Sequence, residues 1–223
     1  MSFDDAVRDP APRRWILATA AIGAFASAIT FTSINVALPS LVVAFETSFA
    51  AVQWVLLGYL LATAALLPIV GRLADMLGKR AIFLAGMAIF TVGSFLTGVA
   101  PGLGWLIAFR LLHGVGSAVL TGVGLAIVTD VFPAEERGRA IGINGALLST
   151  GIVLGPTLGG LLVEVGWRWV FLAGVPVGLL GAALVARFVP SYPRGPAQRF
   201  DVPGAALLVA MLTAGSLAMT LGA

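Results

Sequence analysis

The sequence predicts an all-α membrane protein, and three observations lead to this fold class. Of the 223 residues, 59% are hydrophobic and 10% are charged, and the mean hydropathy is +1.04. A soluble domain carries about 25% charged residues, so a chain this apolar requires lipid around it. Long charge-free stretches recur along the chain, and short polar breaks rich in Pro and Gly separate them.

Each apolar stretch is long enough, or nearly so, to cross a bilayer as a helix. A helix needs about 20 apolar residues to span about 30 Å of hydrocarbon. All the stretches but the fourth are free of charged residues, and the fourth contains Arg110. We expect turns between them, including residues 71–80. The predicted helices are 15–38, 51–70, 81–99, 105–129, 140–163, 169–186 and 203–222.

The basic residues predict the orientation of the chain. With the N-terminus in the cytoplasm, eleven of the thirteen Lys and Arg residues fall in cytoplasmic segments, Arg168 lies outside and Arg110 lies within a helix. Membrane proteins carry this excess on the cytoplasmic side. The net charge of +3 therefore reflects topology, and a nucleic-acid partner is not expected. The eleven residues are Arg8, Arg13, Arg14, Arg72, Lys79, Arg80, Arg137, Arg139, Arg187, Arg194 and Arg199.

This topology divides the chain into four parts. They are a cytoplasmic N-terminal segment (1–14), a six-helix unit (15–189), a cytoplasmic linker (190–202) and a seventh transmembrane helix (203–223). We expect a multi-pass protein of the plasma or inner membrane, with lipid as its surrounding partner.

Composition also excludes several kinds of site. The chain has no cysteine and one histidine, His113, so neither a disulfide nor a cluster of Cys or His metal ligands is available. We expect no metal and no cofactor. Ser117 lies near His113 on the same predicted helix, but no acid is placed to orient such a pair and no oxyanion hole is evident. An enzyme is therefore not expected.

The charged break at 71–80 reads GRLADMLGKR. It resembles the cytoplasmic-loop signature of the major facilitator superfamily, G-x-L-A-D-x-x-G-[RK]-[RK]. Two interpretations stay open: a solvated turn that anchors the topology, with glycines at tight turns, or the gating role that the resemblance implies. In the second, Asp130 at the inner end of the fourth helix is the partner of Lys79 or Arg80. The candidate gating residues are Gly71, Asp75, Gly78, Lys79, Arg80 and Asp130.

Further motifs extend the resemblance along the chain. Residues 110–118, RLLHGVGSA, resemble the helix 4 motif R-x-x-x-G-x-G. Residues 151–160, GIVLGPTLGG, resemble the helix 5 motif G-x-x-x-G-P-x-x-G-G, which is associated with antiporters. Residues 34–39, 167–178 and 200–208 resemble the fourteen-helix branch of the drug:proton antiporters. The resemblance implies a six-helix N-terminal half built from 3+3 inverted repeats, followed by a seventh helix.

The helix 5 motif predicts a small-residue face. Gly151, Gly155 and Gly159 recur every four residues, so they share one side of a helix, and such a face lets membrane helices approach closely. Pro156 removes a backbone hydrogen bond and favours a bend. Gly160 completes the motif. Plain packing and a sliding or bending helix are both compatible with this pattern.

The resemblance also implies a coupling or substrate cavity with Asn35 and Arg110. His113, where the family usually has glutamine, lies one turn beyond Arg110 on the same helix face and is a further candidate for this cavity. The alternatives are that Arg110 extends toward the outer surface and that His113 is a packed polar residue. Thr30 stands where this branch often has an acid, and no Asp or Glu lies within the seven stretches. Gly174 likewise replaces a usual asparagine. The coupling residue and the charge of the substrate therefore stay open.

Together these features predict the N-terminal half of a proton-driven efflux antiporter for small lipophilic compounds. Its partners are then the substrate, protons, and a missing C-terminal half or second subunit, because alternating access requires two halves. The alternative is a truncated membrane-embedded remnant or assembly partner with no transport activity of its own.

The predicted topology is testable with reporter fusions. Eleven basic residues on one side place the C-terminus outside after seven crossings. A reporter that is active only in the cytoplasm is expected to be silent when fused after Ala223 and active when fused within 190–202. Activity after Ala223 contradicts the seven-helix prediction.

Overall fold

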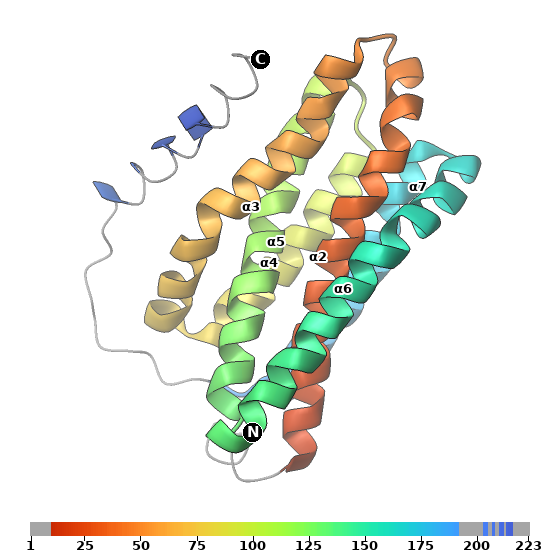
Figure 1. The fold of residues 1–223 in the computed structure, drawn as a ribbon. Coiled ribbons are helices and arrows are strands. Elements are labelled where there is room, and N and C mark those ends of the chain that lie inside the picture. The colour runs from red at the N-terminus through yellow and green to blue at the C-terminus, as the bar shows by residue number, and fades with distance from the viewer. Residues whose placement is uncertain (1–9, 192–202, 205–206, 208–209, 212, 216–223) are drawn as a thin grey trace.

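The computed structural model is a bundle of long helices joined by short connections at its two ends (Figure 1). It describes residues 10–191 and, beyond them, 203–204, 207, 210–211 and 213–215. Within residues 10–191 the helices are α2 (Pro10–Ala44), α3 (Phe49–Leu77), α4 (Lys79–Gly98), α5 (Leu103–Val131), α6 (Ala134–Val165), α7 (Trp167–Leu172) and α8 (Gly174–Phe188).

The all-α membrane fold is confirmed. Among the described residues, six spans are long and apolar enough to cross a membrane, and α7 and α8 together form the sixth. The predicted seventh helix, 203–222, falls largely outside the described residues, and the few positions described there are helical.

The predicted turn at 71–80 is wrong, because helix continues through most of it. Helix α3 ends at Leu77 and α4 starts at Lys79, so Gly78 alone separates them. Gly78 has φ of +98°, a conformation that favours glycine. Gly71 lies inside α3, and a Cβ added there would meet nothing within 4 Å, so it serves neither a turn nor a close approach. Buried Ala74 extends the apolar face of α3 and explains why the helix continues.

The predicted sixth helix, 169–186, is also corrected, since two helices meet at Ala173. Pro176 has no N–H to donate to the carbonyl of Leu172, which weakens the helix at this point. The neighbouring carbonyl, that of Phe171, accepts a hydrogen bond of 2.5 Å from Ser94 Oγ of α4. The joint therefore faces α4 and is held by it.

The helices pair in a reciprocal way. Helix α6 lies along α2, and α3 lies along α5 (Figure 1). The first three spans are α2, α3 and α4, and the next three are α5, α6 and α7 with α8. The first helix of each set packs on the second helix of the other set, as expected for two inverted repeats. Helix α4 packs against both α5 and α8.

Glycines bring α6 into direct contact with the backbone of α2. Gly151, Gly155 and Gly159 are all buried on the α2 side. A Cβ added at Gly159 would lie 2.7 Å from the carbonyl oxygen of Ser33. Ser33 Oγ in turn donates to the carbonyl of Gly155 over 2.9 Å. The helices are therefore held by backbone proximity and by interhelical hydrogen bonds.

The remaining motif residues of α6 lie off this face. Pro156 is exposed, and α6 continues through it as a single helix. A Cβ added at Gly160 would come no closer than 3.9 Å to Val36.

The Gly159 contact predicts a difference between two glycines of one helix. Gly159→Ala forces α6 away from the α2 backbone and is expected to destabilise the chain by about 1–3 kcal/mol. Gly145→Ala is the matched control, because an added Cβ there meets nothing within 4 Å, and alanine gains up to about 1 kcal/mol over glycine in a helix. Thermal unfolding in detergent measures both variants. Equal stability of the two variants contradicts the packing account.

Candidate functional site

Arg110 is the largest fully buried side chain of the described residues, with no exposed surface. Its Nε donates to the carbonyl of Val55 over 3.2 Å, and its Nη1 lies 3.4 Å from Nδ1 of His113. The guanidinium carbon sits 4.3 Å from the centre of the Tyr59 ring. Arg110 therefore faces the interior of the bundle and does not extend to the outer surface. Its Nη2 has no hydrogen-bond partner among the described residues.

His113 is equally buried and packs against aromatic rings. Its ring centre lies 4.4 Å from that of Phe90 and 5.7 Å from that of Tyr59. A guanidinium can only donate, so Nδ1 of His113 accepts from Arg110 and the ring proton sits on Nε2. Within the part of the chain that is described, Nε2 also finds no hydrogen-bond partner. The pair thus combines a buried charge with a titratable ring.

Tyr59 joins three helices at this cluster. Its hydroxyl donates to the carbonyl of Ser27 on α2 over 3.1 Å and lies 2.6 Å from Ser117 Oγ on α5. Ser117 therefore bonds to Tyr59 and does not form a pair with His113. Sequence reasoning missed Tyr59. A lone tyrosine in an apolar span, with an arginine in another, was the available signal.

Asn35 is not part of this cluster. It is exposed on α2, and its Nδ2 donates to the carbonyl of Thr32 in its own helix over 3.3 Å. The structure thus brings Arg110 and His113 together and leaves Asn35 on an open face of the bundle.

The charges at the α3–α4 junction form contacts with two other helices. Lys79 Nζ lies 2.6 Å from Asp130 Oδ2 of α5 and 3.3 Å from Asp75 Oδ1. Asp130 therefore pairs with Lys79 and not with Arg80. Arg80 donates instead to the carbonyl of Ala186 over 2.7 Å and to Ser191 Oγ over 3.1 Å, at the end of α8. We refer to Asp75, Lys79, Arg80 and Asp130 with these partners as the inner latch, after the cytoplasmic gating role that the motif resemblance predicts for them.

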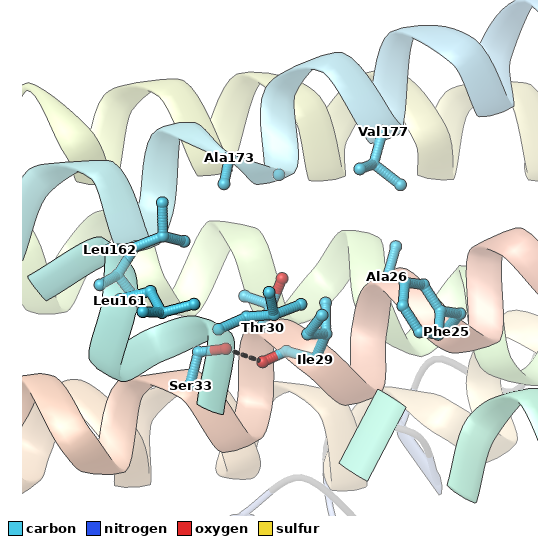
Figure 2. Close-up of a pocket in the computed structure, with 12 residues that line it drawn as sticks. Phe25, Ala26, Ile29, Thr30, Ser33, Leu161, Leu162, Ala173 and Val177 are labelled. Atoms are coloured by element: carbon cyan, nitrogen blue, oxygen red, sulfur yellow. Dashed lines mark hydrogen bonds between the residues drawn. The ribbon is translucent and has the colours of Figure 1, made fainter. Parts of the chain in front are cut away.

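A cavity of about 440 Å³ lies over α2, between α6 and the α7–α8 joint (Figure 2). Its lining is almost entirely apolar, and the exceptions are the hydroxyl residues Thr30 and Ser33. Thr30 sits at the middle of the floor, with Ala173 and Val177 opposite. Thr30 is the position at which an acid was considered from the sequence. No group of His, Cys, Asp or Glu that could hold a metal ion occurs among the described residues.

The family model described as Major Facilitator Superfamily matches residues 20–222. The chain belongs to the major facilitator superfamily. It is accordingly a multi-pass membrane protein of a transporter family and not an enzyme.

Curated members of the superfamily resemble the chain over nearly all of its length. It is 35% identical to "Riboflavin transporter RibZ" of Clostridioides difficile over 210 residues, which cover 93% of this chain and 46% of that protein. It is 33% identical to "Multidrug resistance protein 3" of Bacillus subtilis over 221 residues, 99% of this chain and 43% of that protein. The chain thus spans less than half the length of these relatives.

Solved transporters share the fold. A bacterial homologue of the human lysosomal transporter Spinster, in an inward-facing and unoccupied conformation, matches with a TM-score of 0.74 at 24% identity, over 87% of this chain and 47% of that one. The human organic anion transporter MFSD10 matches with a TM-score of 0.72 at 19% identity, over 90% and 54%. The bundle is therefore the superfamily fold, present over about half the length of these transporters.

We expect the ion pairs of the inner latch to stabilise the backbone at the α3–α4 junction. Asp130→Asn removes the nearer carboxylate from Lys79 and is expected to raise hydrogen exchange of residues 75–82 a few-fold, since a partly exposed ion pair contributes up to about 1 kcal/mol. Glu135→Gln on α6 is the control, a carboxylate substitution outside the latch. Hydrogen-exchange mass spectrometry compares the two, and equal exchange in both variants contradicts the latch.

Proposed function

We propose that the chain is the N-terminal half of a proton-driven efflux antiporter for small lipophilic compounds. In this proposal it sits in the plasma or inner membrane with its N-terminus in the cytoplasm. The superfamily assignment and the relative named for multidrug resistance support it. The relative named for riboflavin offers a more polar substrate class, and the apolar lining of the cavity favours the lipophilic one.

The observation that carries the coupling proposal is the buried Arg110–His113 pair. A charge within a membrane span is costly, and such residues usually mark ion or substrate pathways. A second proton on His113 would turn Nδ1 into a donor that faces the donor Nη1 of Arg110, 3.4 Å away. The contact would then break. Protonation of one side chain is thereby converted into movement of another.

Helix α3 connects this pair to the inner latch. Arg110 binds the Val55 carbonyl and the Tyr59 ring, both on α3. The same helix carries Asp75 and ends at Leu77, and the next residue, Gly78, has a backbone conformation that allows a change of direction. Displacement of Arg110 therefore shifts α3, and the shift reaches the contacts of Lys79. This route links proton uptake to opening of the cytoplasmic face.

Transport in this proposal requires a second half. Alternating access moves one repeat bundle against another around a shared site near the middle of the membrane. The exposed face of α2 that carries Asn35 would line that site, with the opposite wall supplied by a C-terminal half or a second subunit. The competing proposal is a remnant or assembly partner without transport.

Arg110 variants test the coupling proposal. In a protein that contains both halves, Arg110→Ala is expected to abolish efflux of a lipophilic dye driven by a proton gradient in vesicles. Arg110→Lys is expected not to restore it fully, because an ammonium has no planar fork to contact Val55 and His113 together.

The control in the same assay is the 223-residue chain alone, which is expected to move dye at the background rate. Full efflux by Arg110→Ala contradicts the coupling role. Gradient-driven efflux by the chain alone contradicts the half-transporter proposal.

A further inference from the structure

Thr30 differs from Thr19, Thr32 and Ser33, which are buried hydroxyl residues of the same helix α2, and it shares with buried Ser27 the lack of a hydrogen-bond partner among the described residues. A serine or threonine within a helix usually donates to the carbonyl four residues earlier. Thr19, Thr32 and Ser33 do so over 2.7, 3.0 and 2.6 Å. Thr30 is 5% exposed, and within residues 10–191 no hydrogen bond of its hydroxyl is found. Its side chain lines the cavity over α2 (Figure 2), so its hydroxyl is available to a molecule that occupies that space.

The cavity exists because the two helices that flank it, α6 and α8, pack against different helices. Helix α6 presents its glycines to α2, whereas α8 presents Gly174, Gly178 and Gly181 to α4. A Cβ added at Gly181 would lie 2.7 Å from Sδ of Met87 on α4, so α8 is held tightly there. Helices α6 and α8 do not pack substantially against each other in the described structure. Together they leave an opening above α2.

The size and lining of the cavity define its ligand. Its volume of about 440 Å³ falls within the range of about 300–1,000 Å³ that small-molecule pockets have. The lining contains no charged side chain, so a charged ligand would be buried without a partner, at a high cost. Leu158 and Leu161 of α6, at its rim, are 38% and 58% exposed. An exposed, apolar rim favours entry of the ligand from lipid over entry from water.

We propose that this cavity binds a neutral lipophilic molecule with a hydrogen-bond acceptor, which enters from the bilayer between α6 and α8. The Thr30 hydroxyl donates to that acceptor, and Ala173 and Val177 cover the apolar part. The inference rests on the proposed efflux function and names its substrate class as neutral. A carbonyl compound with aromatic rings has the required chemistry.

Benzophenone tests the site directly, since it is neutral, lipophilic, carries one carbonyl acceptor and crosslinks to nearby C–H groups under light. The chain in phosphatidylcholine nanodiscs is irradiated at increasing benzophenone concentrations, and labelled peptides are identified by mass spectrometry. We expect saturable labelling concentrated in 25–33, 158–162 and 173–177. Thr30→Val, which keeps the side-chain size, should raise the half-saturating concentration about threefold to tenfold through loss of one hydrogen bond.

Two further variants separate the cavity from the lipid-facing surface. Ala173→Phe fills the cavity and should abolish the saturable labelling. Ala183→Phe makes the same addition at an exposed position of α8 outside the cavity lining, so it should leave the labelling intact. Circular dichroism establishes that each variant is folded. Labelling that is spread evenly over lipid-facing helices, or unchanged in both Ala173→Phe and Thr30→Val, overturns the proposal.

The charge of the ligand is tested by competition. Tetraphenylphosphonium, a lipophilic cation, should not displace benzophenone, and displacement overturns the assignment of a neutral ligand. Because the assay measures binding and not transport, its failure leaves the efflux experiment unaffected. If benzophenone labels the cavity as expected but dye efflux fails, the result contradicts the proposed efflux function and leaves the proposed binding site standing.

Discussion

Close approach of helix backbones at glycine is the constraint on which the rest of this bundle depends. In hydrocarbon, apolar side chains gain little by leaving lipid, so membrane helices associate through tight packing and interhelical hydrogen bonds. Helix α5 is enclosed in this way from two sides. A Cβ added at Gly114 would lie 2.6 Å from the Tyr59 carbonyl of α3, and one at Gly116 would lie 2.5 Å from the backbone nitrogen of Phe90 of α4. Helices α3 and α4 can therefore close around the polar side chains of α5.

That enclosure makes a buried arginine tolerable. A charge at the centre of a membrane helix costs about 2.5–3.5 kcal/mol on insertion scales. A desolvated cation over an aromatic ring gains about 2 kcal/mol, and a hydrogen bond from a charged group gains about 1.5–3 kcal/mol. The Tyr59 ring and the Val55 carbonyl supply both to Arg110. The cost and the gains are of similar size, so these contacts can offset the burial of the charge.

The sequence was most informative about features that depend on a single helix, such as its apolar length and the face on which its small residues lie. Composition and the recurring charge-free stretches predicted the all-α membrane class, and the spacing of Gly151, Gly155 and Gly159 predicted a face that the structure directs at α2. Contacts between helices were harder. Tyr59 as the partner of Arg110 depends on which helices pair, and periodicity does not encode that. The cavity above Thr30 depends on the packing of α8 against α4 through glycines. The sequence does not show which neighbouring helix those glycines contact.

The errors at element ends have a related cause. Glycines and charges in 71–80 suggested a turn, but residues such as Ala74 keep α3 helical until a single position with positive φ is reached. The break between α7 and α8 at Ala173 has two causes. Pro176 removes one backbone hydrogen bond, and Ser94 of α4 donates to the carbonyl of Phe171. Glycine, proline and charged residues in the sequence indicated roughly where these helices end. The exact ends depend on contacts with neighbouring helices.

The ion pairs of the inner latch can be compared in energy with a charge that crosses a membrane potential. Lys79 contacts Asp75 and Asp130, while Arg80 binds the end of α8, so two adjacent residues tie three helix ends together. Partly exposed ion pairs contribute up to about 1 kcal/mol each. One elementary charge that crosses a potential of about 100 mV releases about 2.3 kcal/mol. The ion pairs of Lys79 are thus of the same order as the work of moving one elementary charge across that potential.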